Sequence, residues 1–233
     1  DELSYPHNLT VRRFSLSSQN EEDGIIHAIF GKIGKGSRRF VEIGAGTNGG
    51  NSGFLARECG WNGMMLEANS RRSNRLKLRF EALGVPCLTD WVARENINDL
   101  VRDNGCAGEI DLLSIDIDGN DYWIWEAMTA CSPRLVIIEY NSLFGPDRAV
   151  VVPYDPEFDR HRVAETVEGG SIYYFGASLQ ALTRLAKQKG YRLVVTEPRG
   201  VNAFFLRNDV GNEIPASDPA SGYRMLMKYA ARG

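Results

Sequence analysis

Residues 39–49, with the sequence RFVEIGAGTNG, decide the fold. The apolar run RFVEI has the length of a buried strand, and Gly44, Gly46 and Gly49 follow it in the spacing G-x-G-x-x-G. A strand that ends in such a turn and continues into a helix, here expected at about 51–59, is typical of a nucleotide-binding βαβ unit. The stretch therefore predicts an α/β sheet with a ligand at the end of its first strand.

The rest of the chain alternates apolar runs with amphipathic stretches, which predicts a mostly parallel sheet with helices on both faces. Further strands are expected at 63–67, 86–89, 111–116, 134–140, 191–196 and 202–207, and further helices at 21–35, 70–83, 97–104, 121–130 and 177–189. The link 197–201 is too short for a helical crossover, so the last two strands should pair as an antiparallel hairpin. The expected fold is a Rossmann-like α/β sheet with one reversed strand.

Composition and length fit one globular domain. The 233 residues suffice for one sizeable core, with residues 1–36 as an N-terminal cap and 143–175 as a substrate lid inserted in the domain. A net charge of −3 gives no reason to expect a nucleic-acid partner. No apolar run approaches the ~20 residues of a bilayer span, so no membrane partner is expected. Four scattered cysteines favour free thiols and a cytoplasmic location, and a homo-oligomer is left open.

Two carboxylates indicate what the glycine turn binds. Glu42, inside the first strand, can accept hydrogen bonds from the ammonium group of S-adenosylmethionine (SAM) and would repel a pyrophosphate. Glu67, which ends the next strand, can bind both ribose hydroxyls, as in NAD and SAM sites. Asp90 and Trp91 could contact adenine, although Trp91 could equally belong to the core. The predicted cofactor site comprises Glu42, Gly44, Ala45, Gly46, Glu67, Ala68, Asp90, Trp91 and Asp116.

Further acids follow the fourth and fifth strands. Asp116 and Asp118 come at the end of one, and Glu139 and Asn141 at the end of the other. Because parallel strands place their carboxyl ends at one edge, these oxygens form a set suited to Mg²⁺ or another divalent cation. Such an ion would lower the pKa of an acceptor hydroxyl. The alternative is a hydrogen-bonded acid cluster without metal.

A general base is expected among three residues. Asp118 and Glu139 lie where the ligand should bind, and His161 lies in the irregular segment 143–175, where a lid over the cofactor is expected. A surface histidine without a catalytic role is the alternative for His161.

Several motifs in order resemble one family. They are FVEIGAG at 40–46, GWNG at 60–63, SIDIDGNDY at 114–122, IEYN at 138–141, YFGASL at 174–179 and NAFF at 202–205. This set resembles the FkbM-type and related class I SAM-dependent methyltransferases. The resemblance implies a seven-stranded sheet with a reversed terminal strand, SAM as methyl donor, and O-methylation of a small molecule such as a sugar or natural-product intermediate. It also implies a metal on Asp116 or Asp118 with Glu139 and Asn141, although some metal-using relatives carry an acid where Asn141 stands.

Two other functions stay open. A SAM-binding protein could keep the fold while being catalytically inert or running other chemistry. The G-x-G-x-x-G pattern alone would also fit an NAD-dependent oxidoreductase, which the terminal hairpin and Glu42 oppose. The leading prediction is a SAM-dependent methyltransferase that acts on a small-molecule acceptor.

Overall fold

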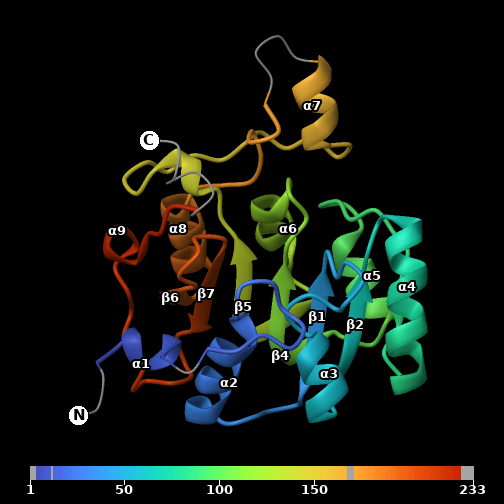
Figure 1. The fold of residues 1–233 in the computed structure, drawn as a ribbon, viewed down its shortest axis with the longest axis horizontal. Coiled ribbons are helices and arrows are strands. Elements are labelled where there is room, and N and C mark those ends of the chain that lie inside the picture. The colour runs from blue at the N-terminus through green and yellow to red at the C-terminus, as the bar shows by residue number, and fades with distance from the viewer. Residues whose placement is uncertain (1–3, 12, 167–170, 227–233) are drawn as a thin grey trace.

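The computed structural model describes residues 4–11, 13–166 and 171–226. Their strands form one seven-stranded sheet in the order β3-β2-β1-β4-β5-β7-β6 (Figure 1). The strands are β1 (Arg39–Ile43), β2 (Asn62–Leu66), β3 (Cys87–Leu88), β4 (Gly108–Ile115), β5 (Cys131–Glu139), β6 (Tyr191–Thr196) and β7 (Asn202–Arg207). Strands β1 to β5 are parallel, and β7 runs antiparallel to both of its neighbours. The expected Rossmann-like sheet is confirmed, with the reversed strand lying between β5 and β6.

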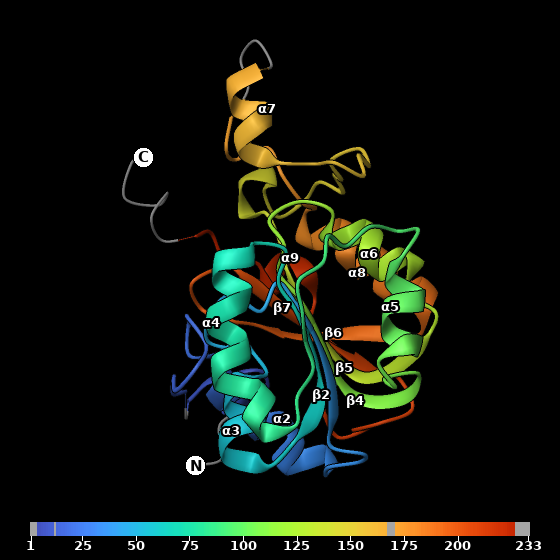
Figure 2. The same cartoon turned by 90° about the vertical axis from the view of Figure 1, so that its right-hand side faces the viewer.

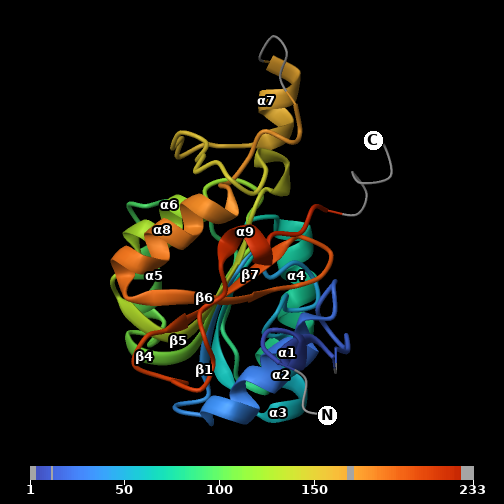
Figure 3. The ribbon, with the colours of Figure 1, turned by 90° about the vertical axis from the view of Figure 1, so that its left-hand side faces the viewer.

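Helices cover both faces of the sheet (Figures 2 and 3). One layer comprises α2 (Glu22–Ile33), α3 (Gly53–Cys59) and α4 (Ser70–Phe80), and the other comprises α5 (Ile97–Asp103), α6 (Asp121–Ala127) and α8 (Leu179–Lys189). Each layer packs on its own cluster of buried apolar side chains. Short elements complete the described chain: α1 (His7–Thr10), η1 (Glu81–Leu83), η2 (Ser142–Phe144), α7 (Arg160–Thr166) and α9 (Pro219–Gly222).

Strand alternation decides which side chains meet which helices. In β1, Val41 and Ile43 join the cluster under α5, α6 and α8, whereas Phe40 joins the cluster under α2, α3 and α4. Since successive side chains point to opposite faces, Glu42 shares the face of Phe40 and points toward the start of α3. The register of one strand thus places a carboxylate beneath the glycine turn.

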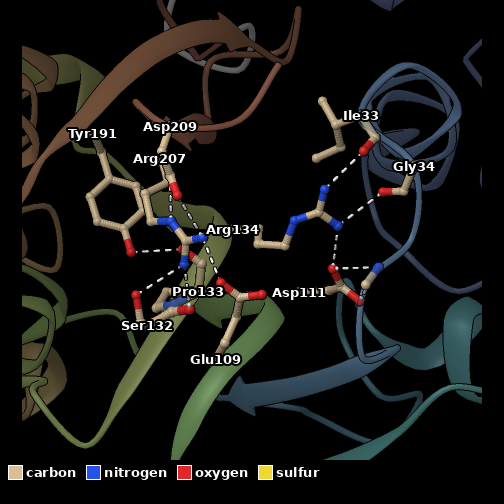
Figure 4. Close-up of polar contacts among 11 residues, drawn as sticks. Ile33, Gly34, Glu109, Asp111, Ser132, Pro133, Arg134, Tyr191, Arg207 and Asp209 are labelled. Atoms are coloured by element: carbon tan, nitrogen blue, oxygen red, sulfur yellow. Dashed lines mark hydrogen bonds and ion pairs between the residues drawn. The ribbon is translucent and has the colours of Figure 1, made fainter. Parts of the chain in front are cut away.

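The amino end of β4 contains a buried ion pair (Figure 4). Asp111, with 0% exposure, lies 2.7 Å from the Arg134 guanidinium. Its carboxylate also accepts hydrogen bonds from the backbone N–H groups of Gly36, at 3.0 Å, and Arg38, at 2.6 Å. Beside it, Arg207 binds both Glu109 and Asp209 at 2.6 Å, and these carboxylates raise the pKa of the guanidinium. Each of these charges therefore has a partner, at the side of the sheet opposite the carboxyl ends of its parallel strands.

The segment that was expected to be irregular contains the helix α7, which projects beyond the carboxyl ends of the strands (Figure 1). The chain before it is bonded to the sheet's loops: the indole of Trp91 donates to the Pro156 carbonyl at 2.7 Å, and Asn120 donates to the Asp155 carbonyl at 2.7 Å. These bonds hold residues 155–156 over the carboxyl edge of the sheet. Whether the segment acts as a lid stays a prediction.

A second segment approaches the same edge from the N-terminus. The Asp23 carboxylate accepts hydrogen bonds from the N–H groups of Leu16, Ser17 and Ser18. Asn48, in the glycine turn, donates to the Ser17 carbonyl. Residues 16–18 therefore lie against the turn, and the role of residues 1–36 as a cap stays a prediction. Among the described helices none has the length and apolar composition of a membrane span.

Candidate functional site

Three cavities lie at the carboxyl ends of the strands, where β1 and β4 are neighbours and the chain's connections diverge to the two sides of the sheet. Open α/β sheets bind their ligands at such a switch point. Cavity A, of about 310 Å³, lies at the ends of β1, β2 and β4. Cavity B, of about 420 Å³, lies at the ends of β4 and β5 and reaches α7. Cavity C, of about 50 Å³, lies between the glycine turn and residues 17–20.

The glycine turn brings β1 against the end of β4. Gly44 has a φ of 86°, and a Cβ atom built on it would lie 1.7 Å from the Asp116 carbonyl oxygen. Only glycine fits both the left-handed backbone and this close approach. The N–H groups of Gly44 and Ala45 donate to the Leu66 carbonyl at 2.9 Å. Gly44 lines cavities A and C, whereas Ala45 is fully buried and lines none of the three.

Glu42 lies at cavity C with a fully bonded carboxylate. Oε2 accepts from the N–H of Ser52 at 3.0 Å and its hydroxyl at 2.6 Å, and Oε1 accepts from Ser114 at 2.9 Å and the Asn51 N–H at 3.2 Å. Burial raises the pKa of Glu42 to about 7 in spite of these bonds. The carboxylate thereby fixes the chain that enters α3. Direct contact with a cofactor's ammonium group stays a prediction, and the two serine donors were not foreseen.

Glu67 ends β2 beside cavity A. Its Oε2 accepts from the Gly46 N–H at 2.9 Å, and its Oε1 accepts from the Asn69 N–H at 2.8 Å. The glycine turn and the start of α4 therefore hold the carboxylate in place. Ala68, Asp90 and Trp91 line the same cavity. Trp91 is 49% exposed, so the alternative of a core tryptophan is wrong.

Asp116, Asp118 and Glu139 form an acid cluster shared by two strand ends. One oxygen of each lies within 4.8 Å of the others. Burial and mutual repulsion raise the pKa values of Asp116 and Glu139 well above the ordinary range of carboxyl groups. Oε2 of Glu139 is buried and has no hydrogen-bond partner among the described residues. A cluster with an orphaned buried oxygen fits a divalent cation, because the ion would provide the missing countercharge.

Asp118 and Arg160 connect this cluster to α7. Asp118 has a left-handed backbone with a φ of 56°, and its carboxylate lies 2.5 Å from the Arg160 guanidinium. Asp121 supports the loop by accepting from the N–H groups of Ile117 and Gly119 at 2.9 Å, and burial raises its pKa to about 6. The loop before α6 thus turns the Asp118 carboxylate toward the incoming segment.

Asn141 lies at the same edge and has another set of contacts. Its Nδ2 donates to the carbonyls of Tyr173 and Phe175, and its Oδ1 accepts from the Leu143 N–H. Asn141 lines cavity B while holding the chain at 173–175. A metal would bind Asn141 through Oδ1, which already accepts one hydrogen bond, so its role as a ligand stays a prediction.

His161 is exposed on α7, and it lines none of the three cavities. The structure does not bring it to the acid cluster, because the preceding residue, Arg160, takes the inward position and lines cavity B. The predicted general base His161 therefore lies away from the acid cluster, and Arg160 of the same segment contacts it instead. Arg72 and Phe158, which line cavity A, were also missed. For Arg72, its position in the first turn after β2 was an available signal.

No protein-family model matches this chain, and no curated protein matches it. Similar solved structures include an O-methyltransferase from Bacillus cereus in complex with S-adenosylhomocysteine (SAH), 16% identical over 86% of this chain and 84% of that chain, with a TM-score of 0.44. The N-terminal domain of EvdMO1 with SAH bound is 13% identical over 81% and 80%, with a TM-score of 0.49. The methyltransferase domain of bacterial CtHen1 is 12% identical over 79% and 96%, with a TM-score of 0.48. The function of this chain has to be inferred from its own side chains.

Proposed function

We propose that this protein is a SAM-dependent methyltransferase that methylates an oxygen of a small-molecule acceptor. One observation carries the proposal: cavities A and B share Asp116 and Asp118 in their linings. A cofactor bound in cavity A would therefore face an acceptor bound in cavity B, with the acid cluster between them. The sheet order with a reversed β7 supports SAM over NAD, whose binding sheet is parallel throughout.

Cavity A suits the adenosine part of the cofactor. Each oxygen of Glu67 accepts one backbone hydrogen bond, which leaves each with a free lone pair for a ribose hydroxyl. Trp91 and Phe158 provide aromatic walls for a base, and Asp90 provides an acceptor for an exocyclic amine. Cavity C, bordered by Glu42 and Gly46, lies on the other side of the glycine turn and suits the methionyl end.

The acid cluster suits the proton transfer that O-methylation requires. As the acceptor oxygen attacks the methyl carbon in line, a C–O bond forms and the C–S bond breaks, leaving SAH. The acceptor's proton has to leave with a base. Glu139 and Asp118 lie at cavity B, and burial beside Asp116 and Asp118 raises the pKa of Glu139, which makes it a stronger proton acceptor than an exposed carboxylate.

Asp116, Asp118 and Glu139 would also be the residues that hold a divalent cation. When bound, the ion would polarise the acceptor hydroxyl and lower its pKa. Asp118 would then share its carboxylate between the ion and Arg160. The three carboxylates would orient the ion, and Arg160 would balance the remaining negative charge.

Calorimetric titration with SAM, SAH and NAD tests the cofactor. We expect SAM and SAH to bind and NAD to fail. Glu67→Gln should weaken SAM binding about tenfold or more, since charged hydrogen bonds contribute roughly 1.5–3 kcal/mol. Glu109→Gln, at the opposite end of the sheet, is the matched control and should bind SAM like the parent protein.

SAH formation over a panel of hydroxylated and amine acceptors tests the reaction. Production of SAH with a hydroxyl acceptor supports O-methylation. NAD binding without SAM binding would overturn the cofactor assignment. SAM binding without SAH formation on any acceptor would favour a SAM-binding protein that does not methylate.

A further inference from the structure

Arg72 stands at the junction of the two larger cavities. It lies in the first turn of α4 and lines both cavity A and cavity B. Among the described residues, the only others in both linings are Asp116 and Asp118. Arg72 is therefore the one cation among the described residues that borders both the proposed cofactor cavity and the proposed acceptor cavity.

The guanidinium of Arg72 has no partner in the described part of the chain. No ion pair or side-chain hydrogen bond between described residues uses it, and the backbone N–H of Arg72 donates to the Asn69 side chain. The other cation of cavity B, Arg160, is engaged: it pairs with Asp118 at 2.5 Å and lies over the Phe175 ring at 5.3 Å. Of the two guanidinium groups at cavity B, that of Arg160 is paired with Asp118, and that of Arg72 can bind a ligand.

The helix that carries Arg72 has a strong local positive charge. Helix α4 carries five basic residues and no acid within Ser70–Phe80, although the whole chain has a net charge of −3. The basic residues are Arg71, Arg72, Arg75, Lys77 and Arg79. None of them enters an ion pair within the described part of the chain. A row of unpaired cations that ends at a cavity attracts anions to its mouth.

We propose that the acceptor is an anion whose carboxylate or phosphate group binds Arg72. This inference rests on the proposed function and specifies its substrate class. The acid cluster on the β4 and β5 side of cavity B repels a negative group, and Arg72 on the α4 side attracts it. The acceptor therefore binds with its anionic group at Arg72 and its hydroxyl at Asp118 and Glu139. A guanidinium suits this role because it binds carboxylate and phosphate groups through two parallel hydrogen bonds.

Matched sugars provide the test. Binding of glucose, glucose 6-phosphate, glucuronate and glucosamine is measured by ligand-observed NMR, with the protein free and saturated with SAH. We expect glucose 6-phosphate or glucuronate to bind at least about tenfold more tightly than glucose, and the preference to shrink as salt is raised. A preference for the phosphate or for the carboxylate identifies which of the two anionic groups is used.

Two variants test whether Arg72 causes the preference for anionic sugars. Arg72→Gln should remove the preference for the anionic sugars while SAH still binds. Arg75→Gln, which changes an exposed cation on the same helix outside the three cavities, should keep it. Equal binding of glucose and its anionic derivatives, stronger binding of glucosamine, or an unchanged preference in Arg72→Gln would overturn the inference. Failure of the parent protein to bind SAH would instead contradict the proposed function, because sugar binding to the free protein is read separately.

Discussion

Asp111 lies toward the amino end of strand β4 and Asp116 directly follows its carboxyl end. The two carboxylates differ in their hydrogen-bond and charge partners. At the amino end, Asp111 is bonded to Arg134 (Figure 4), and it also accepts from two backbone N–H groups. At the carboxyl end, the carboxylate of Asp116 accepts no hydrogen bond from the described residues, and it faces Asp118 and Glu139. The aspartate at the amino end thus has its own cation, whereas the three carboxylates at the carboxyl end share one described countercharge, Arg160.

The difference separates stability from ligand binding. A buried carboxylate with its partners in place tolerates the loss of water, whereas one among like charges has its pKa raised and favours whatever neutralises it. The ion pair at the amino end should therefore contribute to the stability of the fold. The acid cluster at the carboxyl end should instead favour binding of a proton, a cation or a substrate. The following changes test that division.

The largest effect is expected at the amino end. Arg134→Met leaves Asp111 buried without its cation, which should lower the free energy of unfolding by about 3–5 kcal/mol. Urea denaturation measures it. Arg102→Met, which breaks the exposed pair with Asp99, should cost less than about 1 kcal/mol. Equal losses in the two variants would mean that the Asp111–Arg134 pair contributes no more to the free energy of unfolding than an exposed pair does.

A pH dependence is expected from Glu42. Its pKa of about 7 in the folded protein exceeds the unfolded value of 4.5, so the folded state binds more protons between these values. Its contribution to stability should be greatest below pH 4.5, fall by about 3 kcal/mol as the pH rises to 7, and stay constant above. The difference between the stability curves of the parent and Glu42→Gln isolates this slope. A flat difference curve would show that Glu42 has the same pKa in the folded and unfolded states.

Divalent cations should raise the free energy of unfolding by binding to the acid cluster at the carboxyl ends of β4 and β5. Adding Mg²⁺ or Mn²⁺ at about a hundred times its dissociation constant should raise the free energy of unfolding by about 2.7 kcal/mol. Removal with a chelator should reverse the gain, as measured by thermal denaturation. Glu139→Gln is the matched variant, because it keeps the shape and removes one carboxylate of the cluster. The same gain in both proteins would place the ion elsewhere.

The smallest effect is expected from Glu139→Gln without metal. Removing one acid of the cluster relieves repulsion around a buried, unpartnered oxygen, so the metal-free variant should be more stable than the parent by about 1–2 kcal/mol at neutral pH. Methyl transfer should fall at the same time. A variant that is less stable and equally active would assign Glu139 to the scaffold.

Local sequence patterns predicted most of the sheet. The spans 39–43, 191–196 and 202–207 agree with β1, β6 and β7 at both ends, because each is an apolar run bounded by turn residues. Strand β4 begins at Gly108 and β5 at Cys131, each three residues before its predicted start. Parallel pairing between these two strands extends them beyond the runs that mark their cores.

The site was predicted less completely, because its contacts are between distant residues. Nothing near Glu42 in the sequence indicates the Ser114 hydroxyl that bonds it, since the two meet only through the pairing of β1 with β4. In α7 the sequence RHRVAET shows no apolar stripe, and no residue of that helix is buried. Its periodicity could not distinguish the inward Arg160 from the exposed His161.

The left-handed backbone of Asp118 limits which residues fit at this position. Glycine adopts a φ of 56° without strain, whereas most other residues lose roughly 1–2 kcal/mol there. Aspartate is one of the few other residues that adopt this conformation readily, and here it also places a carboxylate against Arg160. We therefore expect Asp118→Gly to keep the turn while removing the link between the acid cluster and α7.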